Sequence, residues 1–298
     1  MPELPEVETI RRDLVDFIKG KKIKSVIINN KKTVRNKAAF FVSYLTNRKI
    51  LDIDRRGKLL IIALEKKDDE KEGQFLLVHL KMTGQLIFVQ GRKSVAGGHS
   101  LSEGSFLKAI GGALPNKHTR VIFVFAANAF LYFNDLRLFG YLEIVSRKRM
   151  EEIKAKNYGP EPLSPDLTIS YLKTLLKNRT SSIKAILLNQ KLVAGLGNIY
   201  VDESLFLAGI KPQRVGKSLK TKEIEKLIKS INKVIAKAID NRGTTFNNYV
   251  DSQGKKGNFT RLLKVYGRQG AICLRCGKVI EKCRLAGRGT HYCPNCQK

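Results

Sequence analysis

Four cysteines near the C-terminal end of the chain constrain its fold more than any other feature of the sequence. Cys273 and Cys276 are separated by two residues, and Cys293 and Cys296 repeat that spacing after a gap of sixteen residues. Paired spacings of this kind in an intracellular chain favour four thiolates around one tetrahedral zinc ion over disulfides. We therefore predict a four-cysteine zinc ribbon over residues 261–298 that holds one structural Zn2+.

The first eight residues combine two prolines and three carboxylates ahead of a helix. Pro5 fits the first helical position, and Glu6 falls in the first turn, where the helix dipole favours negative charge. The apolar residues that follow at helical spacing, up to a stop at Gly20, are Val7, Ile10, Leu14, Phe17 and Ile18. This pattern places Pro2 and Glu3 just outside the positive end of a buried helix. A well-capped helix without any chemistry is the simpler interpretation.

Pro2 gives this N-terminus its chemical interest. A small residue after Met1 favours removal of the initiator methionine, so we expect the mature chain to begin with the proline amine. A free α-amine has a pKa near ~8, and part of it is neutral and nucleophilic at neutral pH. Attack of this secondary amine on a sugar carbon would give a positively charged iminium, which is a strong electron sink. Glu3, one residue away, could donate or accept protons.

Residues 1–146 predict a β-sandwich with flanking helices, because many short strands alternate with turn signals. The expected strands span 24–30, 49–54, 58–64, 74–80, 86–89, 120–125, 130–134 and 138–145, and a short helix spans 38–45. The stretch 91–117 is long, rich in glycine and without periodicity, which is typical of a functional or disordered loop. We expect it to be a mobile insertion.

The pattern becomes helical beyond a proline-containing linker at 157–166, and residues 147–260 predict a second domain. The helices expected there span 169–176, 182–188, 198–208 and 222–239. The glycine-containing turn 193–198 ends on Asn198, which we expect to cap the next helix and to leave backbone N–H groups that could hold a phosphate. The whole chain is therefore predicted to be an α+β protein of three domains.

The net charge of the chain is +30, with 56 Lys and Arg against 26 Asp and Glu. Such an excess on a folded chain indicates a polyanionic partner, most plausibly nucleic acid, although a ribosomal or an acidic-membrane partner could also explain it. The sequence has no apolar run of transmembrane length and no basic signal peptide. We expect an intracellular protein.

Six features in order along the chain carry a family resemblance. They are Pro2-Glu3-Leu4-Pro5-Glu6-Val7-Glu8, Arg56-Gly57-Lys58, His79-Leu80-Lys81-Met82-Thr83-Gly84, Arg137-Leu138-Phe139-Gly140, Leu196-Gly197-Asn198-Ile199-Tyr200 and the zinc ribbon. Together they resemble the formamidopyrimidine-DNA glycosylase family, bacterial enzymes that remove oxidised purines from DNA. The resemblance implies a helix–two-turn–helix domain after the β-sandwich and damaged duplex DNA in the cleft between domains. It also implies a monomer in the bacterial cytoplasm, associated with the nucleoid.

The resemblance also implies a catalytic role for five residues. Pro2 would attack C1′ of the damaged nucleotide, and Glu3 would supply the proton that opens the sugar. Glu6 would order the site, Lys58 would donate the proton of the β-elimination step, and Arg288 would bind the phosphate in δ-elimination. The simpler alternatives are a solvated turn for Lys58 and a solvated loop for Arg288.

Further residues match DNA-contacting positions of the family. Met82, Arg137 and Phe139 would fill the stack that a flipped base vacates, although Met82 and Phe139 could instead be ordinary core residues. His118 would contact the DNA backbone, and Asn198 would be both a helix cap and a phosphate ligand.

Some positions depart from the family pattern, and others bear on the substrate. Leu138 replaces an arginine beside Phe139. The resemblance implies DNA contacts at Arg179 and Thr180, although Thr180 stands where the family commonly has a DNA-contacting lysine. The segment 243–259 resembles the part of the family that closes over an oxidised purine. This favours purine lesions over the pyrimidine lesions of the related endonuclease VIII branch. A non-catalytic DNA-binding zinc protein is the alternative from a different class.

Overall fold

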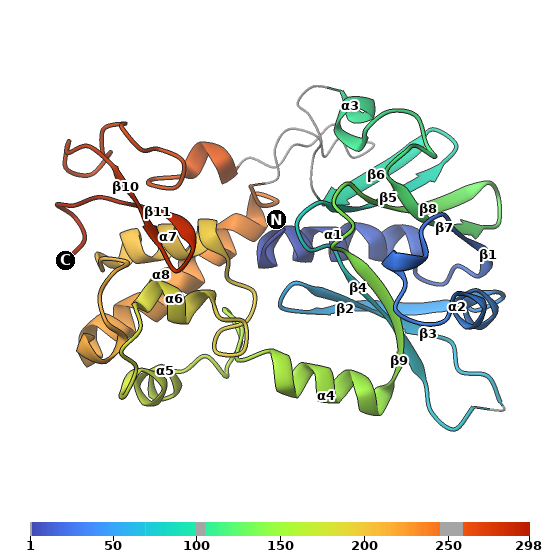
Figure 1. Ribbon diagram of the computed structural model, residues 1–298, viewed down its shortest axis with the longest axis horizontal. Coiled ribbons are helices and arrows are strands. Elements are labelled where there is room, and N and C mark those ends of the chain that lie inside the picture. Colours follow the sequence, from blue (N-terminus) through green and yellow to red (C-terminus); the bar gives the residue numbers. More distant parts are fainter. Residues whose placement is uncertain (1, 69, 99–104, 245–258) are drawn as a thin grey trace. The chain divides into compact units, whose positions relative to one another are not determined.

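The computed structural model describes residues 2–68, 70–98, 105–244 and 259–298, which pack as two compact units (Figure 1). The first unit comprises Met1–Lys154 and Arg242–Asn258, and the second comprises Ala155–Asn241 and Phe259–Lys298. The division into three domains at residues 146 and 260 stays a prediction. Among the described residues, no helix combines the length and the apolar character needed to cross a bilayer.

The first unit is built on two antiparallel sheets. The five-stranded sheet has the order β1 (Ile23–Ile28), β7 (Thr119–Phe125), β8 (Ala129–Asp135), β5 (Gly84–Gln90) and β6 (Lys93–Gly98). The four-stranded sheet has the order β2 (Ile50–Arg56), β3 (Leu59–Leu64), β4 (Gln74–His79) and β9 (Tyr141–Ser146). This confirms the β-rich N-terminal part of the predicted α+β fold.

Helix α1 (Leu4–Ile18) contacts strands of both sheets, namely β2 and β3 on one side and β5 and β6 on the other (Figure 1). Its apolar stripe, including Val7, Ile10 and Leu14, is buried in the core that the sheets share. The helix begins one residue earlier than predicted, so Pro5 is its second residue, where a missing N–H is still tolerated. The shorter helices α2 (Ala38–Leu45) and η1 (Lys31–Thr33) flank the sheets.

The stretch predicted to be a mobile insertion is partly ordered, and that prediction was wrong for its described residues. It contains β6, which pairs with β5, and helix α3 (Phe106–Ile110). Ile110 packs with Ile87, Ile122 and Tyr132 on a face of the five-stranded sheet, and Gln85 Nε2 donates to the Ala109 carbonyl over 2.9 Å. A helix of one turn and a glycine-rich edge strand carry little periodicity, so only packing against the sheet could identify them.

The second unit is helical, as predicted. Its helices are α5 (Ile169–Leu176), α6 (Ile183–Leu188), α7 (Asn198–Ala208), η2 (Gly216–Ser218), α8 (Thr221–Asp240) and η3 (Phe259–Leu262). The hairpin of β10 (Glu281–Leu285) and β11 (Arg288–Tyr292) follows, and β11 contacts α7. Helix α4 (Arg147–Asn157), which carries the chain from one unit into the other, was not predicted, because its charged sequence buries only Met150 and shows no apolar stripe.

Candidate functional site

The N-terminal residues are buried at the start of α1. The Glu3 backbone N–H donates to Glu6 Oε2 over 2.8 Å, and the side chains of both glutamates are buried. This contact satisfies a donor at the helix end and fixes the direction of the entering chain. The structure therefore holds Pro2, Glu3 and Glu6 together at the positive end of the helix dipole.

Glu6 also holds a segment that is distant in sequence. Its Oε1 accepts hydrogen bonds from the Thr244 backbone N–H at 2.7 Å and from the Thr244 hydroxyl at 3.0 Å. Gly243 has a φ of +78°, and a Cβ atom there would lie 2.5 Å from Glu6 Oε1. Further along α1, Asp13 accepts from the Arg242 guanidinium at 2.6 Å. Glu6 is thus a positioning group, since both its oxygens hold backbone donors. Nothing in the sequence pattern identified Arg242 or Thr244 as neighbours of α1.

Lys58 follows Gly57 in the hairpin that joins β2 and β3, and Gly57 has a φ of +57°. The lysine is only 5% exposed, so the interpretation as a solvated turn residue was wrong. Its charge acts on His79 in the neighbouring strand. Burial, then the charges of Lys81 and Lys58, lower the pKa of His79 to about 3, which keeps this imidazole neutral.

Glu8 connects α1 to the hairpin that carries Lys58. Its carboxylate accepts from Arg11 and Arg12 on its own helix and from Arg55 Nε on β2, each at 2.8 Å. Burial alone would raise the pKa of Glu8, but these hydrogen bonds and the charge of Arg55 outweigh it and lower the pKa to about 2. The ion pairs therefore fix α1 against β2, the strand that leads into the turn with Lys58.

Met82, Arg137 and Phe139 are brought together on two adjoining turns. Arg137 Nη1 lies 3.4 Å from Met82 Sδ, and the guanidinium lies 4.7 Å from the centre of the Phe139 ring. Phe139 is 51% exposed, so it is not a core residue, and Leu138 beside it is exposed with a φ of +58°. An exposed aromatic ring backed by an arginine can stack on a base.

A buried aspartate, which sequence analysis missed, builds these two turns. Asp135 accepts from the Thr83 hydroxyl with Oδ1 and from the Gly140 backbone N–H with Oδ2 at 2.7 Å, and the Arg137 N–H donates to Thr83 Oγ1 over 3.0 Å. The Asp135 N–H donates to the carbonyl of His118 over 2.9 Å, so His118 adjoins the same turns. The pKa of His118 is lowered, mainly by burial and to a smaller extent by the positive charges of Lys117 and Arg120. The neutral ring can still donate one hydrogen bond.

In the second unit, Asn198 is the first residue of α7 and Gly197 is the cap, so the prediction of an Asn198 cap was wrong. Asn198 Nδ2 instead donates to the Gly289 carbonyl over 2.9 Å. Lys184 Nζ donates to the same carbonyl over 3.2 Å and to Asp202 Oδ1 over 2.6 Å. Asp202 Oδ2 then accepts from the His291 backbone N–H at 2.8 Å.

These hydrogen bonds attach the β10–β11 hairpin to α6 and α7. Its turn has φ values of +50° at Ala286 and +70° at Gly287, and it exposes the side chain of Arg288. Arg179 and Thr180 are also exposed, in the turn that precedes α6. The side chain of Arg288 is therefore solvated, as the simpler alternative predicted. The backbone carbonyl of the next residue, Gly289, is held by the buried Lys184 and by Asn198.

The four predicted zinc ligands converge. The Sγ atoms of Cys273, Cys276, Cys293 and Cys296 all lie within 4.8 Å of one another. The separation is 3.9 Å for the Cys273–Cys296 pair and 3.5 Å for the Cys276–Cys293 pair. Tetrahedral Zn–S bonds of about 2.3 Å require sulfur atoms to lie about 3.8 Å apart. The donor set fits one structural zinc ion.

Three family models match successive parts of the chain. The formamidopyrimidine-DNA glycosylase N-terminal domain matches residues 1–142, the formamidopyrimidine-DNA glycosylase H2TH domain matches 158–249, and a zinc finger found in FPG and IleRS matches 273–298. The matches, the mixed fold and the four-cysteine site define a zinc-finger DNA glycosylase.

Curated relatives and solved structures match over the full length. A formamidopyrimidine-DNA glycosylase of Carboxydothermus hydrogenoformans is 42% identical over 100% of both chains, and one of Pelotomaculum thermopropionicum is 39% identical over 100% of this chain and 99% of its own. A Lactococcus lactis Fpg complex with abasic-site DNA has a TM-score of 0.85 and 36% identity, with 99% of each chain covered. The chain belongs to the formamidopyrimidine-DNA glycosylase family.

Proposed function

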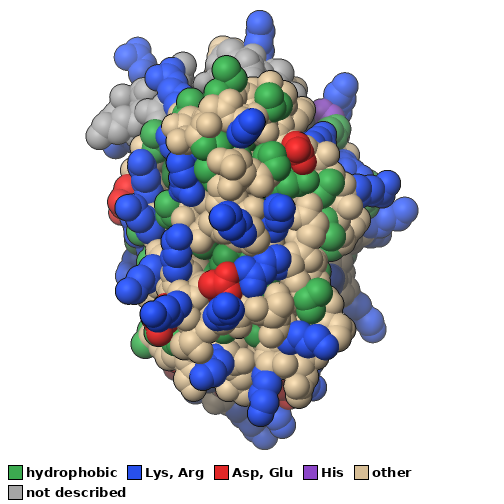
Figure 2. All heavy atoms as spheres, turned by 90° about the vertical axis from the view of Figure 1, so that its left-hand side faces the viewer, with side chains coloured by type: hydrophobic (Ala, Val, Ile, Leu, Met, Phe, Trp, Pro, Cys, Tyr) green, Lys and Arg blue, Asp and Glu red, His purple; other side chains and the backbone are tan. Residues whose placement is uncertain are grey.

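We propose that this chain is a bifunctional DNA glycosylase and AP lyase of base excision repair that removes 8-oxoguanine and formamidopyrimidines from duplex DNA. The observation that carries the proposal is the buried N-terminal group of Pro2, Glu3 and Glu6 in a member of this family. The charge of +30 supports a polyanionic substrate, and Figure 2 shows one face on which Lys and Arg side chains far outnumber Asp and Glu.

In the glycosylase step, the Pro2 nitrogen forms a bond to C1′ while the bond from C1′ to the damaged base breaks. The base departs with the bonding electron pair and takes up a proton. The C1′–O4′ bond then opens, Glu3 protonates O4′, and loss of the amine proton leaves an iminium between Pro2 and C1′. Glu6 orders this group, because its oxygens hold the Glu3 N–H and Thr244.

In the lyase steps, the iminium acidifies the C2′ proton. Its removal allows β-elimination of the 3′ phosphate, and Lys58 donates a proton to the departing oxygen. A second, δ-elimination breaks the bond to the 5′ phosphate, which Arg288 binds through its guanidinium. The burial of Lys58 supports this role, because a buried side chain keeps a defined position in the site.

The DNA contacts follow the same proposal. Met82, Arg137 and Phe139 fill the vacated stack, which offsets the few kcal/mol that base flipping costs. His118, Asn198 and the exposed turn of Arg179 and Thr180 contact phosphates. The proposal includes a monomer that acts on DNA in the bacterial cytoplasm, at the nucleoid.

Borohydride trapping tests the catalytic claim directly. Protein lacking Met1 should form a covalent adduct with an 8-oxoguanine or abasic duplex, and Pro2→Gly should cleave poorly while binding with unchanged affinity. Pro165→Gly, a proline of the second unit outside the proposed site, is the matched control and should behave as the parent. If the parent forms no adduct, the chain is a non-catalytic DNA-binding zinc protein instead.

A second substrate class has one specific observation in its favour. A solved complex of wild-type Lactococcus lactis Fpg, 35% identical to this chain, contains DNA with an oxidised pyrimidine. Excision should therefore be compared on 8-oxoguanine and thymine-glycol duplexes of the same sequence. We expect faster release of the purine, and a reversed preference would assign the chain an oxidised-pyrimidine activity.

A further inference from the structure

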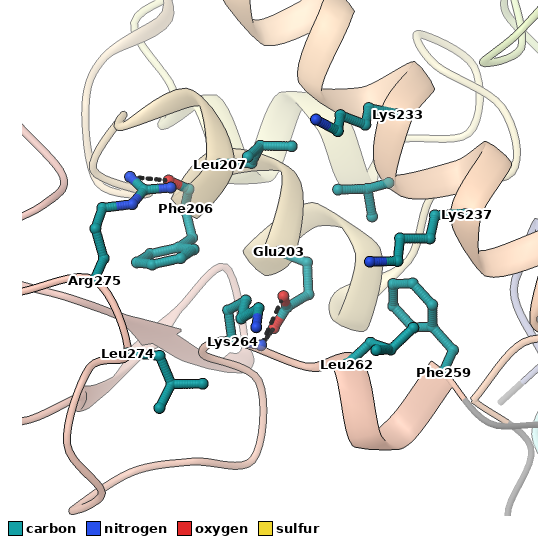
Figure 3. A pocket seen from close by; sticks show the side chains of 11 residues that line it. Glu203, Phe206, Leu207, Lys233, Lys237, Phe259, Leu262, Lys264, Leu274 and Arg275 are labelled. Carbon is teal, nitrogen blue, oxygen red and sulfur yellow. Dashed lines mark hydrogen bonds between the residues drawn. The ribbon is translucent and has the colours of Figure 1, made fainter.

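The second unit contains a cavity of about 380 Å³ that is lined by none of the proposed catalytic or DNA-contacting residues. It is formed by α7, α8, the η3 turn and the first zinc-binding turn (Figure 3). Most of its wall is apolar, from Phe206, Leu207, Val234, Phe259, Leu262 and Leu274. A volume of this size suits one or two large apolar side chains.

Glu203 is the one carboxylate among the described lining residues, and its oxygens are already occupied. Oε1 accepts from the backbone N–H groups of Val265 and Tyr266 at 2.9 Å each, and Oε2 accepts from that of Lys264 at 2.9 Å. Burial raises the pKa of Glu203, although these three donors oppose the shift. The carboxylate therefore holds the backbone that follows η3 and is not exposed for a cationic ligand.

Four cations surround the apolar wall. Lys233 and Lys237 lie four residues apart on α8, so their side chains share one face of the helix, and Figure 3 shows both beside the cavity. Lys264 contributes a third cation. Arg275 donates to the Phe206 carbonyl over 3.3 Å, and its guanidinium lies 4.3 Å from the Phe206 ring centre. The combination is complementary to a ligand with several negative charges and an apolar side chain.

The apolar surface continues outside the cavity on the zinc-binding turn. Leu274 is 66% exposed, and Ile272 and Val279, which pair through an isolated β-bridge, are also more than half exposed. A DNA backbone could pair with the cations, but it offers no apolar group to the exposed side chains of Leu274, Ile272 and Val279. Contiguous exposed apolar residues beside a pocket are typical of protein-interaction sites. An acidic peptide therefore fits this surface better than DNA.

We propose that this pocket binds an acidic segment of a partner protein. A leucine or phenylalanine of the segment enters the cavity between Phe206 and Phe259, and its carboxylates contact Lys233 and Lys237. The exposed Leu274 covers the inserted side chain. A partner bound at this site would contact none of the residues that are proposed to act on the lesion.

Fluorescence anisotropy of a labelled peptide tests this proposal on the full-length, zinc-loaded protein. The probe is a ten-residue peptide of Asp and Glu ending in Leu-Phe, and the comparison peptide ends in Ser-Ser. We expect saturable binding of the first at 150 mM salt and at least tenfold weaker binding of the second. Equal binding of the two peptides would mean that charge alone acts, and would overturn the proposal.

Two variants on different elements locate the site. We expect Leu274→Ser to weaken binding of the Leu-Phe peptide at least tenfold, and the double variant Lys233→Glu with Lys237→Glu to do the same. The zinc content and the circular dichroism spectrum of both should be unchanged. Lys222→Glu is the control; it lies on the same helix, eleven residues or about 16 Å from Lys233. It should change binding less than twofold.

The DNA alternative has its own outcome in the same experiment. Undamaged duplex DNA should bind the Leu274→Ser variant as it binds the parent, and the variant should release 8-oxoguanine at the parent rate. If Leu274→Ser weakens duplex binding and leaves peptide binding unchanged, the surface is a DNA contact and the peptide proposal is wrong.

Discussion

Lys184→Met is the most informative single substitution, because Lys184 and Asp202 form an ion pair whose side chains are both 0% exposed. Among the described residues, the change leaves the buried Asp202 carboxylate with the backbone N–H of His291 as its hydrogen-bond donor, and it removes one donor from the Gly289 carbonyl. Breaking a buried pair in this way costs about 3–5 kcal/mol. With a urea m-value of about 2 kcal/mol/M, the midpoint should fall by about 1.5–2.5 M.

The assay follows both the helices and the zinc site. The chain has no Trp, so unfolding is followed by far-ultraviolet circular dichroism, with zinc release recorded in parallel by a chromophoric chelator. The double variant K184M/D202N should recover about half of the loss, because Asn keeps an acceptor for the His291 N–H and carries no charge. Lys173→Met, an exposed control on α5, should change stability by less than about 0.5 kcal/mol. A loss below about 1 kcal/mol for Lys184→Met, or a double variant no more stable than the single, would refute the reasoning.

Three further predictions follow from the described contacts. The pKa of Glu8 is lowered to about 2, so its ion pairs stabilise the fold above about pH 4.5, and this stability should disappear as the pH falls towards 2. Urea unfolding across that range should show a smaller pH dependence in Glu8→Gln. Gly243→Ala should lower the free energy of unfolding by about 1–3 kcal/mol and slow lesion cleavage, because the added Cβ would clash with Glu6 at a φ of +78°. A thermal scan measures the loss of stability, and a single-turnover assay measures the cleavage rate. Chelation of zinc from Cys273 and its partners should weaken DNA binding, and unchanged affinity after verified zinc loss would contradict a role for the ribbon.

Much of the fold was predictable because the patterns that define it are local. Helix α1 follows from apolar residues three and four positions apart, and the strands of both sheets other than β6 follow from short apolar runs between turn residues. Where such patterns are weak, the prediction failed. Helix α3 has one turn and α4 buries one residue, so neither has a stripe that a sequence can display.

For the site, the sequence by itself determined the zinc ligands and the N-terminal Pro2-Glu3 pair, because these groups depend on spacings of a few residues. Only the tertiary structure decided that Lys58 is buried, that Phe139 is exposed and that Glu6 holds Thr244. The physical reason is distance along the chain. Glu6 and Thr244 are 238 positions apart, and a carboxylate gives no local signal of the backbone N–H that it will bind once the chain has folded.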